Sequence, residues 1–359
     1  MEQKYFFSLM WPDYSEGRRI EAEIRSGEMS LFNQDLLERD INAEMLLEGM
    51  EIRNENKGYI KMRMMDMVLD EKIIKYRQDI LKDFMKHPEI ESAFDQTLLP
   101  LILRLREMKK ANIAHDDNLR KIAWRIEMLK MYMQCVDILH DLICAPGSTF
   151  GSQGMNEFKK MLDELYEGDS YKELKKLLPD LYDKLQTMKG VTIGINLDNE
   201  LRPVEAVLLS IEEKPFRQKG LVTSLLGMRK NDENYFGIGS FYSILRENKA
   251  NSLDIGIMRD LEAVMGDTFK HLGETLTRFE WIETAFLFEL LPEVYYYIGG
   301  CRLASKLQKS GLPICFPEPA PKDERIFQVK DMYDASFALR IMSDIGLKDL
   351  ENVVVCNDA

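Results

Sequence analysis

Residues 119–143 read LRKIAWRIEMLKMYMQCVDILHDLI and carry the longest helical pattern of the chain. Apolar side chains, with one histidine among them, recur there at alternating steps of three and four: Leu119, Ile122, Ile126, Leu129, Met133, Val136, His140 and Ile143. This spacing forms a heptad seam, which predicts a long helix that packs at a shallow angle against another helix.

Helical patterns continue on both sides of this stretch. Asp70 is a plausible N-cap for a helix whose apolar face holds Ile73, Tyr76, Ile80 and Phe84. Pro88 should end that helix and open the next, which leads into a run that reaches residue 110.

Helical period resumes over residues 156–189, with an interruption at 168–170 and a kink near Pro179. It returns from residue 253, where Pro292 should kink the helix and Gly311 should stop it. Residues 1–30 mix aromatic and charged side chains without a clear period. The chain is therefore predicted to be mainly α.

One segment has a period of two instead of 3.6. Apolar residues alternate with polar or small ones over 191–197 and again over 204–210, with Asp198 and Asn199 between the two runs. This pattern predicts a β-hairpin, and Pro203 favours an edge position for its second strand.

The C-terminal segment predicts the start of a different domain. Prolines at 313, 317, 319 and 321 indicate a stiff linker, followed by a short strand over 326–329 and a short helix over 334–345. The final run Val353-Val354-Val355-Cys356 is typical of a strand buried on both faces of a parallel sheet. Because such a strand needs neighbours, we expect these to be the first strands of an α/β domain truncated at Ala359.

Composition limits the classes of function. The chain has 359 residues and a net charge of −13, which argues against a surface that binds nucleic acid everywhere. The five cysteines form no C-x-x-C pair and are expected to be reduced thiols in a cytoplasmic protein. The most apolar stretch, 284–301, is interrupted by two glutamates and a proline, so no membrane association is expected.

The sequence shows no catalytic constellation, so this part of the protein is not expected to be an enzyme. It lacks the phosphate-binding motif G-x-x-x-x-G-K-[ST]. His140 and Cys144 stand four residues apart, which leaves a metal pair open, but no third or fourth ligand is spaced to join them. A hydrogen-bonded core histidine is the favoured interpretation, and neither a metal nor another cofactor is expected here.

One basic stretch interrupts the acidic background. Residues 214–230 contain five positive side chains and no acidic one: Lys214, Arg217, Lys219, Arg229 and Lys230. Such side chains can neutralise phosphates of a nucleic-acid backbone without reading its sequence. The alternative is a solvated loop whose charges only keep it soluble.

Three motifs resemble those of MutS-family mismatch-repair ATPases. Residues 69–81, LDEKIIKYRQDIL, are similar to the helix that opens the core of those proteins, with its I-x-x-R-Q pattern. Residues 193–196, IGIN, resemble the I-G-Y-N strand that opens their clamp domain, and residues 354–358, VVCND, resemble the strand before their Walker A loop. The chain looks closest to a divergent branch without the mismatch-reading N-terminal domains.

This resemblance implies helical core and lever domains, a clamp that weakly contacts DNA backbone, and a homodimeric ATPase that uses ATP and Mg²⁺ in the full-length protein. It places Val354, Val355 and Asn357 at the nucleotide base, in an incomplete site. The expected segments are an N-terminal segment (1–39), a helical core (40–152), lever helices (153–189) and a clamp-like hairpin insertion (190–250). Returning lever and core helices (251–312) and a linker with the start of the ATPase domain (313–359) follow. The leading hypothesis is a non-catalytic core, lever and clamp fragment; the alternative is a helical protein-binding scaffold without a DNA role.

Overall fold

A computed structural model of the protein describes residues 7–26, 34–111 except 67 and 69, 118–215 except 188 and 202, 273–277, 279, 282 and 284–345. The chain divides into two compact units. Unit 1 takes its described residues from 1–106, 132–168 and 282–359, and unit 2 takes them from 107–131 and 169–281.

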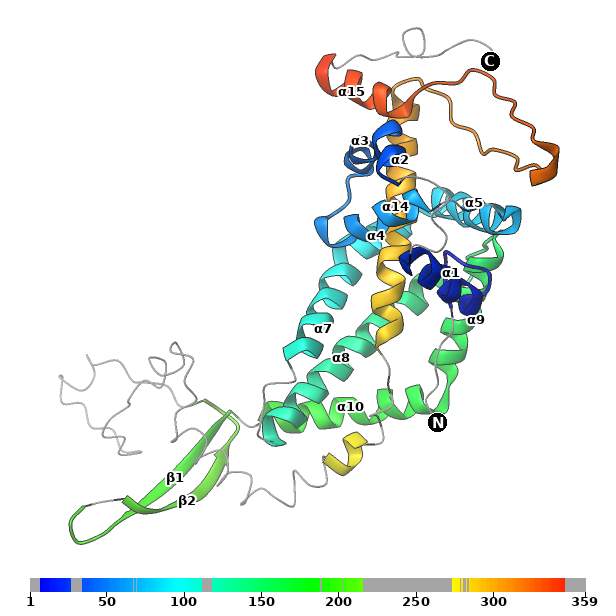
Figure 1. The fold of residues 1–359 in the computed structure, drawn as a ribbon. Helices are drawn as coiled ribbons and strands as arrows, with labels where there is room; N and C mark the ends of the chain where they lie inside the picture. Colours follow the sequence, from blue (N-terminus) through cyan, green and yellow to red (C-terminus); the bar gives the residue numbers. More distant parts are fainter. Residues whose placement is uncertain are drawn as a thin grey trace. The chain divides into compact units, whose positions relative to one another are not determined.

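The described residues are mostly helical, which confirms the predicted mainly α class (Figure 1). The N-terminal half forms α1 Tyr14–Ser26, α2 Gln34–Asp40, α3 Ala43–Gly49, α4 Asn54–Met65, α5 Glu71–Lys86, α6 Pro88–Ala93, a π-helical turn Phe94–Leu98, α7 Leu99–Ala111 and α8 Asn118–Ile143. The chain continues with α9 Gln153–Glu167, α10 Asp169–Thr187, strands β1 Gly190–Leu197 and β2 Pro203–Glu212, α14 Ala285–Lys309, a 3-10 turn Lys322–Glu324 and α15 Ala335–Ile345.

The heptad stretch folds into the single long helix α8, as predicted. Seam residues Ile126, Leu129, Val136 and Ile143 are at most 1% exposed. Cys135 and Leu139, which lie beside the seam, are also fully buried. The buried face of α8 is therefore wider than a two-stranded coiled-coil seam, as expected of a helix inside a globular core.

Helix α5 begins and ends where its sequence predicts. The Asp70 side chain caps the helix by accepting a hydrogen bond from the Lys72 amide at 2.8 Å. The helix ends at Lys86, and Pro88 occupies the first turn of α6. The predicted face is buried: Ile73, Tyr76, Ile80 and Phe84 are each at most 7% exposed.

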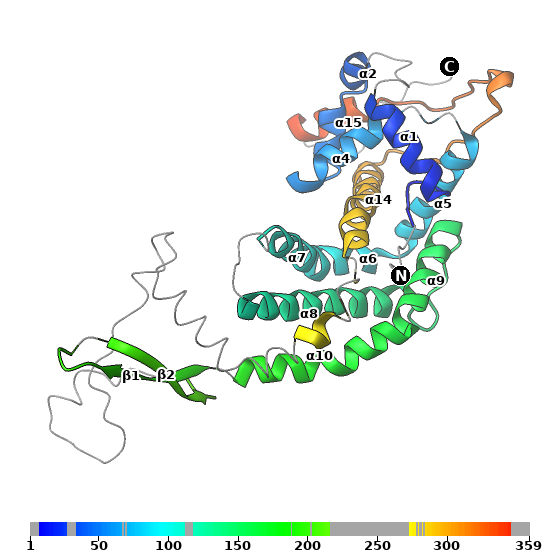
Figure 2. The same ribbon diagram turned by 60° about the horizontal axis from the view of Figure 1, so that its bottom comes forward.

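Unit 1 is organised around α14, which packs against α3, α4, α5 and α15 (Figures 1 and 2). The helix continues through Pro292 and ends at Lys309, just before Gly311. Likewise, α10 in unit 2 continues through Pro179. Among the described residues, no helix combines the length and the apolar character that crossing a bilayer requires.

An extended N-terminal segment, residues 8–11, is fixed to α5 and α14 by its backbone. The Tyr76 hydroxyl donates to the Ser8 carbonyl at 2.7 Å, and the Tyr297 hydroxyl donates to the Leu9 carbonyl at 2.6 Å. The Arg77 side chain donates to the Met10 carbonyl at 3.0 Å. These contacts satisfy backbone groups that no regular structure pairs. Helix α1 follows directly, in a region where the sequence showed no clear period.

Glu293 of α14 completes this attachment. Its carboxylate accepts hydrogen bonds from the Ser8 hydroxyl at 2.8 Å and from the Leu9 amide at 2.6 Å. Burial raises the pKa of Glu293 from 4.5 to about 7, although both hydrogen bonds act in the opposite direction. The residue is 9% exposed, so the free-energy cost of burying its charge is larger than the stabilisation of that charge by the two hydrogen bonds.

The C-terminal segment agrees with its prediction only in part. Helix α15 forms as expected, and Ala338 and Leu339 pack with Leu307 and Leu312 in a small apolar cluster. The predicted strand over 326–329 is wrong, because these residues adopt no regular structure and Ile326 and Phe327 are 61% and 82% exposed. A strand needs a neighbour for its backbone groups, and no described segment pairs with this one. The predicted final strand at 353–356 lies outside the described residues.

We predict that Glu293→Gln removes a pH dependence from the stability of unit 1. Between pH 4.5 and 7 the folded carboxyl keeps a proton that the unfolded one has lost, so its contribution to stability falls as the pH rises through that window. Urea unfolding at pH 5 and pH 8 should show the wild type losing about 2 kcal/mol more than the variant. Glu55→Gln, at an exposed position of α4, is the matched control and should behave as the wild type. Parallel pH curves for wild type and Glu293→Gln would contradict the assignment.

A second prediction concerns the close approach of α9 to α5 at Gly154. A Cβ atom at this position would lie 2.5 Å from Cδ1 of Ile80 and 2.7 Å from the Tyr76 hydroxyl oxygen. Gly154→Ala should therefore lower the free energy of unfolding by about 1–3 kcal/mol. Gly58→Ala in α4, where a Cβ meets nothing within 4 Å, should instead raise it by about 0.5–1 kcal/mol. Equal effects of the two substitutions in chemical denaturation would show that the α5–α9 contact tolerates extra volume.

Candidate functional site

The predicted hairpin forms in unit 2, directly after α10. Strands β1 and β2 pair antiparallel from Gly190 opposite Glu212 to Leu197 opposite Pro203, with two irregularities in register. At the turn, the Asp198 side chain accepts a hydrogen bond from the Glu200 amide at 2.8 Å, which explains why the sequence places Asp there. Pro203 opens β2, where a missing amide hydrogen disrupts the ladder least.

The described part of the hairpin is not itself basic. Its turn and its base carry the carboxylates of Asp198, Glu200, Glu212 and Glu213, with Lys189 and Lys214 beside them. The Glu212 carboxylate accepts hydrogen bonds from the hydroxyls of Ser210 and Thr192 at 2.5 and 3.4 Å. The described hairpin therefore offers little positive charge of its own, and the predicted basic stretch follows β2.

Lys214 is the one member of the basic stretch that the structure describes, and it is exposed two residues after the end of β2. Arg217, Lys219, Arg229 and Lys230 lie outside the described residues, so the stretch remains a prediction. The same holds for the nucleotide-base candidates Val354, Val355 and Asn357.

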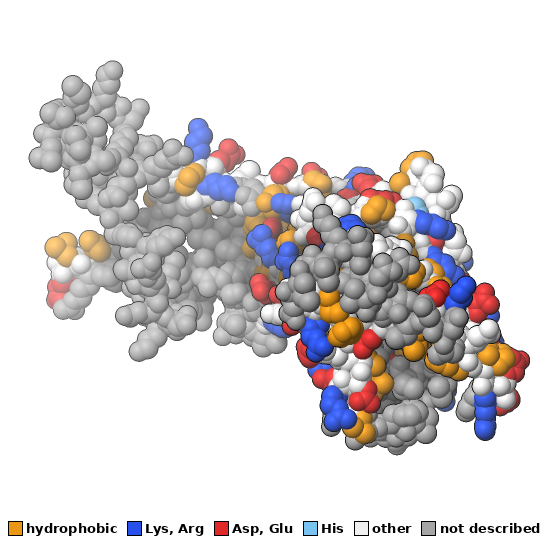
Figure 3. Space-filling view, turned by 90° about the horizontal axis from the view of Figure 1, so that it is seen from above, with side chains coloured by type: hydrophobic (Ala, Val, Ile, Leu, Met, Phe, Trp, Pro, Cys, Tyr) orange, Lys and Arg blue, Asp and Glu red, His pale blue; other side chains and the backbone are white. Residues whose placement is uncertain are grey.

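Elsewhere the charges of the two signs are mixed. On the face shown in Figure 3, basic and acidic side chains alternate over the described residues, and no broad basic patch forms there. Many belong to exposed ion pairs, such as Lys61 with Glu38 and Glu44 at 2.6 Å each. A surface on which positive and negative side chains alternate attracts the phosphates of nucleic acid only weakly.

A buried polar cluster in unit 1 was not anticipated from the sequence. The Arg63 side chain is 0% exposed and pairs with Glu21 and Asp66 at 3.1 Å each. Its guanidinium also lies over the rings of Trp11 and Tyr59, at 5.7 and 5.3 Å from their centroids. Burial raises the pKa of Asp66 to about 6, against the lowering effect of Arg63. Tyr59 and Asp66 are local partners in and just after α4, whereas Trp11 and Glu21 come from separate segments, which no local period marks.

The cluster is best explained as structure. The oxygens of Glu21 accept hydrogen bonds from Trp11 and Arg63, and those of Glu293 are held by Ser8 and Leu9. Carboxylates that bind Trp11, Arg63, Ser8 and Leu9 in this way position the N-terminal segment. We therefore assign them no catalytic role.

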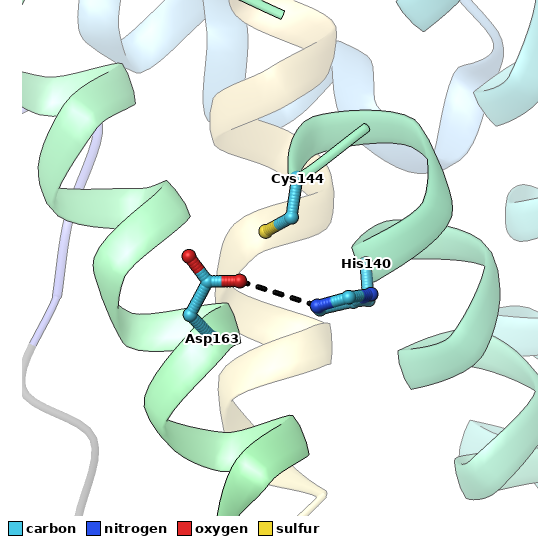
Figure 4. A group of neighbouring side chains, drawn as sticks. All are labelled: His140, Cys144 and Asp163. Atoms are coloured by element: carbon cyan, nitrogen blue, oxygen red, sulfur yellow. Dashed lines mark hydrogen bonds and ion pairs between the residues drawn. The ribbon is translucent and has the colours of Figure 1, made fainter. Parts of the chain in front are cut away.

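A third side chain, that of Asp163, lies beside His140 and Cys144 at the junction of α8 and α9 (Figure 4). The Nε2 atom of His140 is 3.2 Å from Oδ1 of Asp163, and the His140 ring stacks on Tyr166 with centroids 3.8 Å apart. The hydrogen bond of the predicted core histidine is present, but the His140 side chain is 21% exposed and therefore lies at the edge of the core. The prediction that no third ligand is available is wrong, because Asp163 lies on a different helix, beyond the reach of spacing rules within one helix.

Cys144 completes this group. Its thiol donates to the Lys159 carbonyl at 3.6 Å, and burial together with the Asp163 carboxylate raises its pKa to about 12. The ligand atoms of His140, Cys144 and Asp163 all lie within 4.8 Å of one another. The four described cysteines, Cys135, Cys144, Cys301 and Cys315, are free thiols.

Comparison with known proteins identifies the family. A family model described as the MutS2 N-terminal domain matches residues 69–310, about two thirds of the chain. No curated protein and no solved structure matches the chain. The matched region begins one residue before the Asp70 cap of α5 and ends one residue after α14, so it includes α5, α8, α9, the hairpin and α14. The chain therefore belongs to the MutS2 N-terminal domain family and is related to MutS proteins.

Proposed function

We propose that this chain is the non-catalytic core, lever and clamp part of a MutS-related DNA-repair protein. In this proposal the region of the hairpin contacts DNA backbone, and the helices couple that contact to an ATP-binding domain. The family match supports the MutS relationship. That the protein represents a branch without mismatch-reading domains stays a prediction.

The observation that carries the DNA role is the hairpin with Lys214 at its exit. Helix α10 runs into β1 within three residues, β2 returns antiparallel, and exposed Lys214 then opens a stretch of five positive charges without an acidic residue. Because carboxylates dominate the described hairpin and the chain carries −13, any attraction to DNA has to be local.

The proposed contact reads no sequence. Lysine and arginine side chains in a loop neutralise phosphates and release counterions, which makes binding dependent on salt and indifferent to base order. Affinity for a single chain should be weak, and a homodimer would supply a second contact at high effective concentration. A dimer is part of the proposal.

We predict that replacing Lys214, Arg217, Lys219, Arg229 and Lys230 by Ala abolishes most of the salt-dependent DNA binding. Each lost phosphate contact should reduce the slope of log affinity against log salt by about 0.9 for duplex DNA. The measurement is a fluorescence-anisotropy titration of labelled duplex by the full-length protein at several salt concentrations.

The matched control removes the same five charges from exposed positions of α5, α9 and α10. Its substitutions, all to Ala, are at Lys72, Lys75, Lys86, Lys160 and Lys176. If net charge alone governed binding, both variants would lose affinity equally. Equal losses, or unchanged slopes in two folded variants, would overturn the clamp assignment.

We also propose that residues 1–359 neither bind nor hydrolyse ATP, because the sequence lacks a phosphate-cradling G-x-x-x-x-G-K-[ST] loop. Calorimetric titration of this polypeptide with Mg²⁺–ATP should give no stoichiometric binding heat. Saturable binding of one nucleotide per chain would show that another segment forms a nucleotide site.

A protein-binding scaffold is the second candidate, and the exposure of Ile326 and Phe327 favours it. Their side chains are 61% and 82% exposed on adjacent residues of the linker, which a protein partner or another domain could cover. If the five-Ala variant leaves DNA binding unchanged while Phe327→Ser removes a nuclease-resistant protein partner, the scaffold explains the chain better.

A further inference from the structure

Three side chains of different chemistry converge at the end of α8. His140 lies in its last turn, and Cys144 follows one residue after its end, four positions further along. The Cys144 amide donates to the His140 carbonyl at 2.8 Å, so the helical hydrogen-bonding pattern extends to the cysteine. Residues four apart on a helix lie on the same side, which brings the imidazole and the thiol together.

Asp163 approaches the same point from α9. In Figure 4 its carboxylate points toward the His140 ring, with the Cys144 sulfur beside both groups. All three residues belong to unit 1. Among the residues that the structure describes, this is the one group of three histidine, cysteine or acidic side chains that can reach a common ion.

The spacing of the ligand atoms suits a tetrahedral cation. Nε2 of His140 and Oδ1 of Asp163 are 3.2 Å apart. Two ligands that each bind Zn²⁺ at about 2.05 Å with a tetrahedral angle stand about 3.3 Å apart. The Cys144 sulfur is within 4.8 Å of both atoms, whereas tetrahedral zinc requires about 3.5 Å. Binding of all three ligands therefore requires the cysteine side chain to turn from the Lys159 carbonyl toward the other two ligand atoms.

The surroundings hold the histidine in place, and the cysteine makes a weak hydrogen bond that it would exchange for an ion. The His140 ring stacks on Tyr166 with an interplanar angle of 10°, which fixes the direction of Nε2. The Cys144 thiol is directed at the Lys159 carbonyl. Residues 159, 163 and 166 have the i, i+4, i+7 spacing of one helix face, so a single face of α9 receives both side chains from the end of α8.

The nearest cation does not occupy the site. The Lys159 ammonium donates to the Ser148 carbonyl at 3.0 Å, which directs its charge toward the loop before α9. The Asp163 side chain is 48% exposed and that of His140 is 21% exposed, so an ion can enter from solvent and keep a water as fourth ligand. A thiolate, an imidazole and a carboxylate are all zinc ligands, whereas Mg²⁺ and Ca²⁺ select oxygen.

We propose that His140, Cys144 and Asp163 form a Zn²⁺ site that joins the end of α8 to α9. The ion replaces the hydrogen bond between His140 and Asp163, so the proton on Nε2 leaves and the neutral imidazole binds with its remaining proton on Nδ1. The cysteine binds as a thiolate after its own proton leaves to solvent. Its role is to brace the two helices across the loop 145–152, independently of whether the protein contacts DNA.

The test uses protein freed of metal with a chelator and then titrated with Co²⁺ and with Zn²⁺. Co²⁺ should give the absorption bands of tetrahedral coordination together with a thiolate charge-transfer band, and Zn²⁺ should displace it with one ion per chain. Cys144→Ser should remove the charge-transfer band. Cys144→Ser, His140→Gln and Asp163→Asn should each weaken Zn²⁺ binding by about 100-fold or more, beyond what loss of an outer-shell partner causes.

Two further cysteines provide the matched controls. Cys315→Ser removes an exposed thiol and Cys301→Ser a partly buried one, and both variants should bind Zn²⁺ as the wild type does. Zn²⁺ should raise the melting temperature of the wild type and of both controls, but not that of the three ligand variants. Circular dichroism and melting of the metal-free forms separate loss of the site from loss of the fold, because Asp163→Asn and Cys144→Ser change few atoms.

Four results would overturn the proposal: absence of a thiolate band, stoichiometric Zn²⁺ binding that survives in the ligand variants, equal loss in Cys315→Ser, or no Zn²⁺ binding at all. The first would show that the cysteine does not ligate. The second and third would place the zinc elsewhere. If no Zn²⁺ binds at all, the three residues form only the hydrogen bonds described above.

Discussion

The hydrogen bonds of one buried carboxyl group, that of Glu293, join helix α14 of unit 1 to the N-terminal segment. Glu293 sits in the middle of α14, and the donors that satisfy it come from residues 8 and 9, 284 or more positions away in the sequence. Removing those donors would leave a carboxylate in an apolar interior, at a cost larger than the net gain of an ordinary hydrogen bond. The N-terminal segment is therefore required for α14 to pack as it does. The tyrosines that hold the same segment, Tyr76 and Tyr297, bring α5 under the same constraint.

A second polar contact fixes α14 further along. Arg302 binds Glu91 at 2.8 Å, pairs with Asp95, and donates to the Glu51 carbonyl at 2.7 Å. Tyr295 also donates to Asp95 at 2.7 Å. These partners belong to α6, to the π-helical turn after it and to the loop after α3, so one helix joins three separate segments through its polar side chains. Apolar packing gives such a helix its burial, but directional bonds at positions 293, 295 and 302 determine its rotation and its register.

Sequence patterns predicted what depends on neighbours a few residues apart. The seam of α8, the Asp70 cap, the break at Pro88 and the alternation in β1 and β2 are local signals, and each appears where expected. Contacts between residues that are far apart in the sequence are not marked by any local sequence pattern. Helix α1, the burial of Arg63 and the approach of Asp163 to His140 depend on segments meeting in space. The strand expected over 326–329 failed for the same reason, since β-branched and aromatic residues favour extended backbone but cannot supply the partner strand. The DNA-backbone candidates stay predictions, apart from the observed exposure of Lys214.

Buried and exposed charged side chains of the described residues are arranged in different ways. Among the described residues of unit 1, buried charged side chains contact a hydrogen-bond donor, an oppositely charged group or an aromatic ring. A side chain bound in this way cannot contact a second partner without losing the first. On the face shown in Figure 3, exposed charges of both signs are mixed, so their fields largely cancel beyond about one Debye length. The sequence of residues 214–230 holds five positive side chains and no acidic one, and Lys214, the member that the structure describes, is exposed after β2. DNA binding through these residues, as proposed above, would therefore leave the polar contacts of α14 intact. The proposed binding uses long-range attraction between exposed charges, whereas α14 is held by short hydrogen bonds of other residues.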